Sequence, residues 1–229
     1  MEGRISSKRV LSTKLLSEPQ KKIFTDAKIE PVAYDAIQIE FLDFETPATI
    51  KNAIFTSKNA VYSLKNSTAN TLFGQIQDCY CVGKNTRALL EEIGQKVTKT
   101  TEYASELANF IVKERKNEVF YFFCGNLRSD EIPTRLKNAK IDCFEVKTYK
   151  TELNSVKFEQ KWGYILFFSP SGVQSFIAEN NLNDATAICI GTTTASEAKK
   201  HTKNVCIAEE TTIDSVIAKA ISLVNESNI

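Results

Sequence analysis

The feature that most constrains this chain is an internal repeat, because three short motifs of its first half return in the same order in its second half. Two of the pairs are separated by 112 positions (138 − 26 = 112, 166 − 54 = 112) and the third by 108 (189 − 81 = 108). The pairs are 26–30 with 138–142, 54–61 with 166–173, and 81–88 with 189–196. Separations this similar predict a duplicated unit of about half the chain.

The two longer pairs share one pattern: a hydrophobic run, then Ser, Thr or Gly, then a stretch compatible with a helix. Residues 54–61 have the sequence IFTSKNAV, and their counterparts 166–173 have the sequence LFFSPSGV. The pattern predicts a strand that leads into the N-terminus of a helix, where free backbone N–H groups bind anions. A duplicated fold with such turns in both halves predicts a cleft between two similar domains that accepts an acidic ligand.

Short apolar runs alternate with amphipathic stretches along the chain. Leu107, Phe110 and Ile111 show the helical spacing, since they fall on one face of a predicted helix. The predicted strands are 9–13, 35–41, 52–56, 79–82, 119–124, 142–149, 164–169, 187–190 and 204–208. The predicted helices include 86–93, 102–113, 131–138, 172–179, 193–200 and 213–224. The alternation predicts an α/β fold with parallel sheets covered on both faces, in which ligands bind beyond the carboxyl ends of the strands.

Charge and hydropathy restrict the partners. The 229 residues carry 29 Lys and Arg against 28 Asp and Glu, a net charge of +1. A general nucleic-acid-binding protein would carry a basic excess, so we expect no nucleic-acid partner. No apolar run reaches the roughly 18 residues of a membrane span, and the polar N-terminus lacks the apolar core of a signal peptide. We therefore expect a cytoplasmic protein that does not contact a membrane.

Several catalytic chemistries lack the residues that they need. The single histidine, His201, stands among lysines late in a predicted helix, which suits a surface helix end better than a catalytic role. Cys79 and Cys81 lack the spacing of a zinc site and have no histidine nearby, so we expect no metal and interpret the six cysteines as buried, reduced thiols. The glycine motifs of dinucleotide-binding and nucleotide-binding loops, and the nucleophile elbow of α/β-hydrolases, do not occur.

What remains is a set of hydroxyl groups at the predicted strand ends. Any one of them is explained by helix N-capping, in which Ser and Thr are preferred, whereas their repetition at equivalent positions favours a shared binding function. Neighbouring cations would add charge-assisted bonds to carboxylates. The hydroxyl residues are Ser12, Thr13, Thr56, Ser57, Thr86, Ser169, Ser171, Thr192, Thr193 and Thr194, and the cations are Lys14, Lys58, Lys84, Arg87 and Arg128.

At these motifs the sequence resembles the uroporphyrinogen-III synthases. The resemblance covers almost the whole chain, and its motifs follow the family's order. They are 55–61 (FTSKNAV), 82–86 (VGKNT), 149–151 (YKT), 168–173 (FSPSGV) and 190–195 (IGTTTA). The last two motifs together are the most specific part.

The resemblance implies two flavodoxin-like α/β domains joined by a pair of strands, with residues 1–34 and 152–229 in one domain and 35–151 in the other. It also implies a reaction on a linear tetrapyrrole with eight carboxylates, hydroxymethylbilane. This substrate loses its hydroxyl and closes with inversion of ring D, through a spiro intermediate, to give uroporphyrinogen III. The resemblance implies no cofactor, and we expect a monomer.

The resemblance and the strand-end pattern together give a candidate site. Tyr149, at a domain crossing, would help the hydroxyl group of the substrate to leave or would hold the acceptor ring; packing as an ordinary strand residue is the alternative. The substrate-binding residues would be Thr13, Lys14, Thr56, Ser57, Lys58, Gly83, Thr86, Ser169, Ser171, Gly172, Gly191, Thr193 and Thr194.

Three positions depart from the family pattern and change individual contacts. Lys14 stands where the family has Arg, so a guanidinium that can bind a carboxylate through two hydrogen bonds is replaced by an ammonium group that acts as a point charge. Phe168 stands where Thr is common, and Thr192 replaces the usual Pro. Two functions without chemistry also stay open: a two-lobed binding protein for an acidic ligand, and a regulator that kept the fold without the activity.

Overall fold

The computed structural model describes residues 9–66 and 75–226 and divides the chain into two compact units. Unit 1 is discontinuous and combines Met1–Gln38 with Glu152–Ile229, whereas unit 2 is the continuous segment Ile39–Thr151. Within the described ranges, no helix is both long enough and apolar enough to span a membrane.

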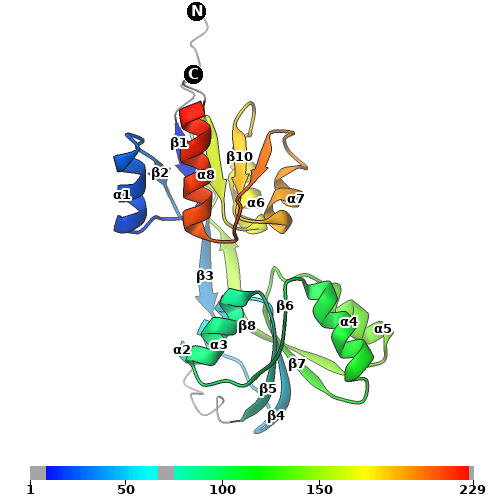
Figure 1. The fold of residues 1–229 in the computed structure, drawn as a ribbon. Coiled ribbons are helices and arrows are strands. Elements are labelled where there is room, and N and C mark those ends of the chain that lie inside the picture. Colours follow the sequence, from blue (N-terminus) through cyan, green and yellow to red (C-terminus); the bar gives the residue numbers. More distant parts are fainter. Residues whose placement is uncertain (1–8, 67–74, 227–229) are drawn as a thin grey trace, which may run out of the picture. The chain divides into compact units, whose positions relative to one another are not determined.

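Unit 1 contains one parallel sheet of five strands. They are β1 (Val10–Ser12), β2 (Val32–Ala33), β9 (Tyr164–Phe167), β10 (Thr186–Cys189) and β11 (Val205–Ile207), in the spatial order β11-β10-β9-β1-β2. The helices are α1 (Glu18–Asp26), α6 (Pro170–Glu179), α7 (Thr192–Ala198) and α8 (Ile213–Glu226). Helices α1 and α8 pack on one face of the sheet, around Phe24 and Leu166, and α6 and α7 cover the other face, around Phe167 and Phe176 (Figure 1).

Unit 2 contains a sheet of six strands. They are β3 (Ile37–Phe41), β4 (Ile50–Phe55), β5 (Ile76–Val82), β6 (Val97–Thr101), β7 (Phe120–Gly125) and β8 (Cys143–Leu153), in the order β3-β8-β7-β4-β5-β6. The helices are α2 (Lys58–Asn66), α3 (Lys84–Glu92), α4 (Ala104–Glu114) and α5 (Glu131–Asn138). Strands β4 to β8 are parallel. Helices α2 and α3 pack around Phe55 and Phe123, and α4 and α5 pack on the opposite face around Tyr80 and Phe122.

The two units have the same architecture with a different chain order. Starting from β9, unit 1 runs β9-α6-β10-α7-β11-α8, and its other segment supplies β1-α1-β2. Unit 2 runs β4-α2-β5-α3-β6-α4-β7-α5-β8 in one stretch. Strands β9, β10, β11, β1 and β2 therefore correspond to β4, β5, β6, β7 and β8, and both sets have the same spatial order. The chain order of unit 1 is a circular permutation of that of unit 2.

The repeat predicted from the sequence is confirmed in the strand register and in the backbone. The repeated strand pairs have equivalent partners, Phe55 with Cys81 and Phe167 with Cys189. The shortest motif places a lysine just after a helix in each unit, and both lysines adopt the left-handed conformation, with φ of 58° at Lys28 and 57° at Lys140. Each of these lysines donates its backbone N–H to the carbonyl three residues earlier, at 2.9 and 3.0 Å. The two halves thus end equivalent helices in the same way.

The sequence predicted the α/β class, the central strands and, from the pattern of residues 54–61, the start of α2, but three elements were missed: α1, β2 and β6. Helix α1 has the sequence EPQKKIFTD and buries only Phe24, so its apolar stripe is too narrow to be recognised. Strand β6 has the sequence VTKTT and is half-buried at every position, so it lacks the alternation of buried and exposed residues that marks a strand. Strand β2 has only two residues.

Each sheet has one point where the direction of its strand order reverses. In unit 1 this point lies between β1 and β9, and in unit 2 it lies between β7 and β4. The connections after the two strands leave toward opposite faces of the sheet, which opens a crevice at the carboxyl ends of the strands. These two carboxyl edges are where the predicted site residues lie.

Candidate active site

Three hydroxyl groups gather at the reversal point of unit 1. Thr13 follows β1, and its Oγ1 donates a hydrogen bond to the carbonyl of Leu166 in β9 at 2.7 Å. Ser169 caps α6, since its Oγ accepts the N–H of Gly172 at 3.0 Å, and the same Oγ lies 3.0 Å from Oγ of Ser171. A Cβ at Gly172 would lie 3.4 Å from both Thr13 Oγ1 and Ser169 Oγ, so the missing side chain lets α6 approach the end of β1 closely.

The neighbouring strand β10 leads to a second group at the same edge. Gly191 ends the connection and is the N-cap residue of α7. Thr193 is exposed and Thr194 is buried in the first turn of this helix. Neither threonine hydroxyl has a hydrogen-bond partner among the described residues, so capping does not account for them. Lys14, beside Thr13, is exposed.

The carboxyl edge of unit 2 repeats this arrangement after β4 and β5. Ser57 precedes α2, and its Oγ accepts the N–H of Asn59 at 3.2 Å; Thr56 and Ser57 are half-buried, and Lys58 is exposed. Gly83 has φ of 86°, in the left-handed region that favours glycine, and turns the chain from β5 into α3. Thr86 is buried in the first turn of α3.

Tyr149 reaches the same edge of unit 2 because of a bulge in β8. Cys124 pairs with Lys147 and Gly125 with Tyr149, so Thr148 is an extra residue without an opposite partner. A bulge of this kind redirects the following side chain. The Tyr149 ring lies directly over Gly125, where an added Cβ would be 2.4 Å from the ring. Glycine at the end of β7 is thus required by the position of the tyrosine.

The surroundings of Tyr149 keep its phenol protonated. Burial raises the pKa of Tyr149, and hydrogen bonds to the Ser57 side chain and to the Gly125 backbone lower it by less, so the pKa stays above its ordinary value of 10.0. The phenol therefore keeps its proton at neutral pH. The Tyr149 ring also packs in the apolar core on the α2 and α3 face, as the alternative of an ordinary strand residue predicts.

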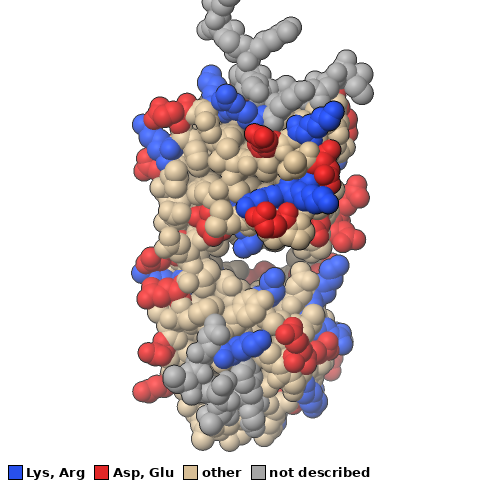
Figure 2. Space-filling view, turned by 90° about the vertical axis from the view of Figure 1, so that its left-hand side faces the viewer, with Lys and Arg blue, Asp and Glu red and all other residues tan. Residues whose placement is uncertain are grey.

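The five predicted cations differ in their availability. Arg87 is paired with Glu91 at 2.8 Å. Arg128 binds both carboxylate oxygens of Glu145, at 2.7 and 2.6 Å, and also contacts Asp130. The three lysines have no ion-pair partner within the described part of the chain; they are Lys14, Lys58 and Lys84. Basic and acidic side chains are intermixed on the face shown in Figure 2.

The sequence did not identify Gly125 as a site residue. The available signal was a glycine that closes the apolar run FYFFCG, since glycine at a strand end marks a close approach of another group. Its identification required the register of β7 against β8, which no motif encodes.

The histidine and the cysteines are the remaining reactive side chains. In residues 9–66 and 75–226, no group of three or more His, Cys, Asp or Glu side chains is placed to hold a metal ion. His201 is exposed just after α7. The six cysteines are free thiols, four buried and two half-buried. Burial raises the pKa of Cys79, Cys143 and Cys189 to about 12, so these thiols stay protonated.

Comparison with known families agrees with this geometry. The family model described as uroporphyrinogen-III synthase HemD matches residues 20–218. The chain belongs to the uroporphyrinogen-III synthase family. A curated member, the porphyrin biosynthesis protein HemD of Ruminiclostridium josui, is 33% identical over 169 residues, which are 68% of this chain and 32% of that protein. The chain therefore spans about a third of the length of this relative.

Solved structures of uroporphyrinogen-III synthases share the fold. The enzyme of Helicobacter pylori has a TM-score of 0.69 at 21% identity, with 94% of this chain and 99% of that chain covered. A mutant enzyme of Thermus thermophilus has a TM-score of 0.69 at 11% identity, with 96% and 99% covered. The family's two-domain α/β architecture is thus present in this chain.

Proposed function

We propose that this protein is a uroporphyrinogen-III synthase, which cyclises hydroxymethylbilane with inversion of ring D and loss of water. The observation that carries the proposal is the placement of Tyr149 in a member of this family: a protonated phenol at the carboxyl edge of unit 2, beside the hydroxyl of Ser57. The reaction needs a donor at the departing oxygen, and the phenol is a donor that needs no cofactor.

The carboxyl edges suit the acidic groups of the substrate. Helices α2, α3, α6 and α7 begin there, and the N-terminus of a helix favours a negative charge. Further donors come from the hydroxyls of Thr86 and Thr194 and from the ammonium groups of Lys14 and Lys58. In residues 9–66 and 75–226 these hydroxyls have no hydrogen-bond partner and these lysines have no ion-pair partner. Each bond to a carboxylate contributes about 1.5–3 kcal/mol at most, so binding is distributed over many groups.

Tyr149 acts as the proton donor in this proposal. The bond between the methylene carbon and the hydroxyl oxygen breaks, the oxygen keeps the electron pair, and the phenol proton converts it to water. The freed carbon then bonds to the ring D carbon that carries the neighbouring methylene bridge, which gives the spiro intermediate. The bond from that bridge to ring D breaks and re-forms at the other α-carbon of the ring. Closure leaves the macrocycle with one excess proton, whose loss restores the aromatic pyrrole and returns a proton to the phenolate. A positioned general acid typically contributes about 10²–10⁴-fold to the rate.

The oligomeric state and the cellular compartment are further parts of the same proposal. The protein would act as a monomer, because one chain already carries both copies of the duplicated unit. Its free thiols suit the reducing cytoplasm, where disulfides are rare. Light scattering on the purified chain tests the monomer, and a molar mass near twice 25.7 kDa would contradict it.

The activity is tested by incubating the purified protein with hydroxymethylbilane and separating the oxidised products by chromatography. Spontaneous closure gives a different isomer, so the type III isomer is expected only with the enzyme. Tight binding of product together with no type III isomer would support a binding or regulatory protein and would refute the proposed activity.

A further inference from the structure

Two leucines stand exposed at equivalent places in the two units. Leu15 and Leu127 are 112 positions apart (127 − 15 = 112), the same separation as the left-handed lysines Lys28 and Lys140. Leu15 lies between β1 and α1, and Leu127 lies between the corresponding elements β7 and α5. Their exposed fractions are 57% and 52%. Each therefore follows one of the two strands that flank the reversal point of its sheet.

An exposed leucine is common on protein surfaces and needs no explanation by itself. Leu15, however, is presented by an anchored backbone, since its N–H donates to Oδ1 of Asp35 at 2.9 Å. The residues before it are also fixed, because Thr13 is bonded to the end of β9 through both its N–H and its hydroxyl. The loop thus holds an exposed apolar side chain two residues after Thr13, at the carboxyl end of β1.

Leu127 is held in an equivalent way by its two neighbours. The side chain of Asn126 exchanges two hydrogen bonds with the backbone of Thr151, at 2.7 and 3.1 Å. On the other side, the guanidinium of Arg128 is clamped by Glu145. Both units therefore fix the loop that carries the leucine while leaving the leucine itself exposed, although the anchoring residues differ. Because the two units anchor these loops with different residues and both leave the leucine exposed, we interpret the exposed leucine side chain as functional.

The role follows from a contact that the predicted substrate-binding residues do not supply. The predicted binding residues are hydroxyls, glycines and lysines, which suit the carboxylates of a tetrapyrrole but not the faces of its pyrrole rings. We propose that Leu15 and Leu127 are substrate-positioning residues that contact pyrrole rings of the linear tetrapyrrole. This inference rests on the proposed function and adds ring recognition to the recognition of charge.

The test is a comparison of Leu15→Ala and Leu127→Ala with the wild-type protein. A contact made equally in the bound substrate and in the transition state raises KM and leaves kcat unchanged. We expect KM for hydroxymethylbilane to rise about 5–30-fold in each variant, the factor that corresponds to one or two kcal/mol. The melting temperature should not change, because both side chains are exposed.

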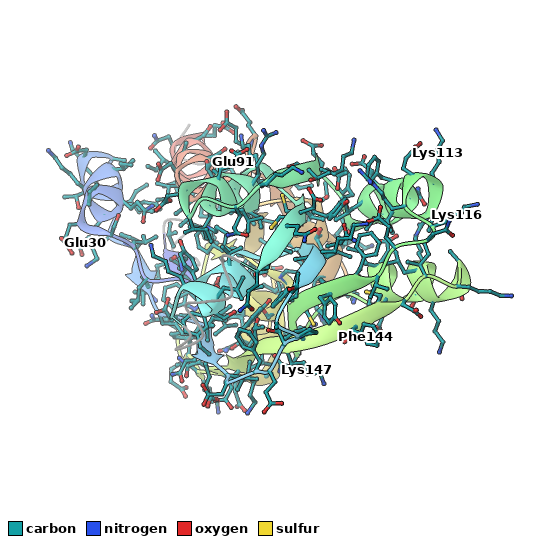
Figure 3. The ribbon with its side chains drawn as sticks, turned by 90° about the horizontal axis from the view of Figure 1, so that it is seen from below. Glu30, Glu91, Lys113, Lys116, Phe144 and Lys147 are labelled. Carbon is teal, nitrogen blue, oxygen red and sulfur yellow. The ribbon has the colours of Figure 1, made fainter. Side chains whose placement is uncertain are left out.

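Matched controls remove exposed apolar side chains elsewhere in each unit. Ile23 on α1 is 41% exposed, and Phe144, labelled in Figure 3, lies near the amino-terminal end of β8 and is 54% exposed. Neither residue is part of the carboxyl edge. We expect Ile23→Ala and Phe144→Ala to keep the wild-type KM, so a rise in KM in these controls as large as in the leucine variants would overturn the inference.

A binding assay separates ring recognition from charge recognition. Fluorescence titration with uroporphyrin III should give a raised Kd for both leucine variants, whereas a ring-free polycarboxylate, butane-1,2,3,4-tetracarboxylate, should compete equally well in all proteins. Leucine variants with wild-type KM and wild-type Kd would overturn the inference. If the wild type bound uroporphyrin III but formed no type III isomer, the proposed activity would be refuted, and the Kd values of the variants would still decide the role of the leucines. If the wild type neither bound uroporphyrin III nor formed the type III isomer, the proposed activity and the role of the leucines would both be refuted.

Discussion

Replacing Gly125 by Ala tests whether catalysis depends on the position of the Tyr149 ring. A Cβ at residue 125 would lie 2.4 Å from Cε2, 2.6 Å from Cζ and 2.9 Å from Cδ2 of Tyr149. Carbon atoms in contact are about 3.5–4.0 Å apart, so the ring must move by roughly 1 Å. Gly125 is not in the left-handed region, so the clash with the ring is the main effect. A misplacement of this size costs about 10²-fold in rate, and overpacking lowers the free energy of unfolding by about 1–3 kcal/mol.

The measurement is kcat for formation of the type III isomer, together with urea unfolding to show that the variant is folded at the assay temperature. The double variant Gly125→Ala/Tyr149→Phe is the control. Displacing the phenol and removing it should both abolish the contribution of the phenol to kcat. Two changes that act through one group are non-additive. The double variant should therefore be about as slow as the slower single variant. A folded Gly125→Ala protein with more than half the wild-type kcat would refute the reasoning. The reasoning would also be wrong if the factor by which the double variant loses kcat equalled the product of the factors for the two single variants.

Two further predictions follow from the site, and a third follows from a partly buried hydrogen bond of unit 2, in which the Asn52 amide donates to the Glu118 carboxylate at 2.8 Å. Tyr149→Phe should lower kcat by about 10²–10⁴-fold while product affinity changes little; a variant that keeps more than half its rate rules out the acid role. Thr86→Ala and Ser171→Ala should each lower kcat/KM about 10–100-fold, and loss of all activity in a folded variant would contradict distributed binding. The hydrogen bond from Asn52 holds the pKa of Glu118 below its ordinary 4.5, so the stability that this carboxylate contributes is present above that pH and is lost as the pH falls through the lowered pKa. Glu118→Gln should therefore unfold at lower urea than the wild type at pH 7, with the difference shrinking below about pH 4; an equal difference at both pH values would show that the charge is not responsible.

The fold was largely predictable because the repeated motifs lie where local sequence constrains structure most. A buried strand, a turn and a helix start each need particular residue types, so residues 54–61 and 166–173 kept similar sequences in both halves. The shortest motif marks the left-handed helix ends at Lys28 and Lys140, although lysine is not a usual residue there. The carboxyl edges then followed from the alternation of strands and helices.

The details of the site depend on register and on partners far apart in the sequence, so motifs did not predict them. The bulge at Thr148 sets the direction of Tyr149 and exists only in the pairing of β8 with β7. The availability of the cations depends on such partners too, because Glu145 binds Arg128 from 17 positions away. The missed strand β6 is an edge strand whose polar composition says little without its neighbour β5.

The permuted chain order of unit 1 has a consequence for the order in which the protein folds during synthesis. Strand β1 meets β9 through the bond from Thr13 to Leu166, which spans 153 positions. At about 5–20 residues per second, the ribosome takes roughly 8–30 s to supply that partner. All strands of the unit 2 sheet lie between Ile37 and Leu153, so this sheet can close before the strands β9 to β11 have emerged. The inserted unit is thus the first to complete its core during translation, and the enclosing unit completes its core only after β9 to β11 and α8 have been synthesised.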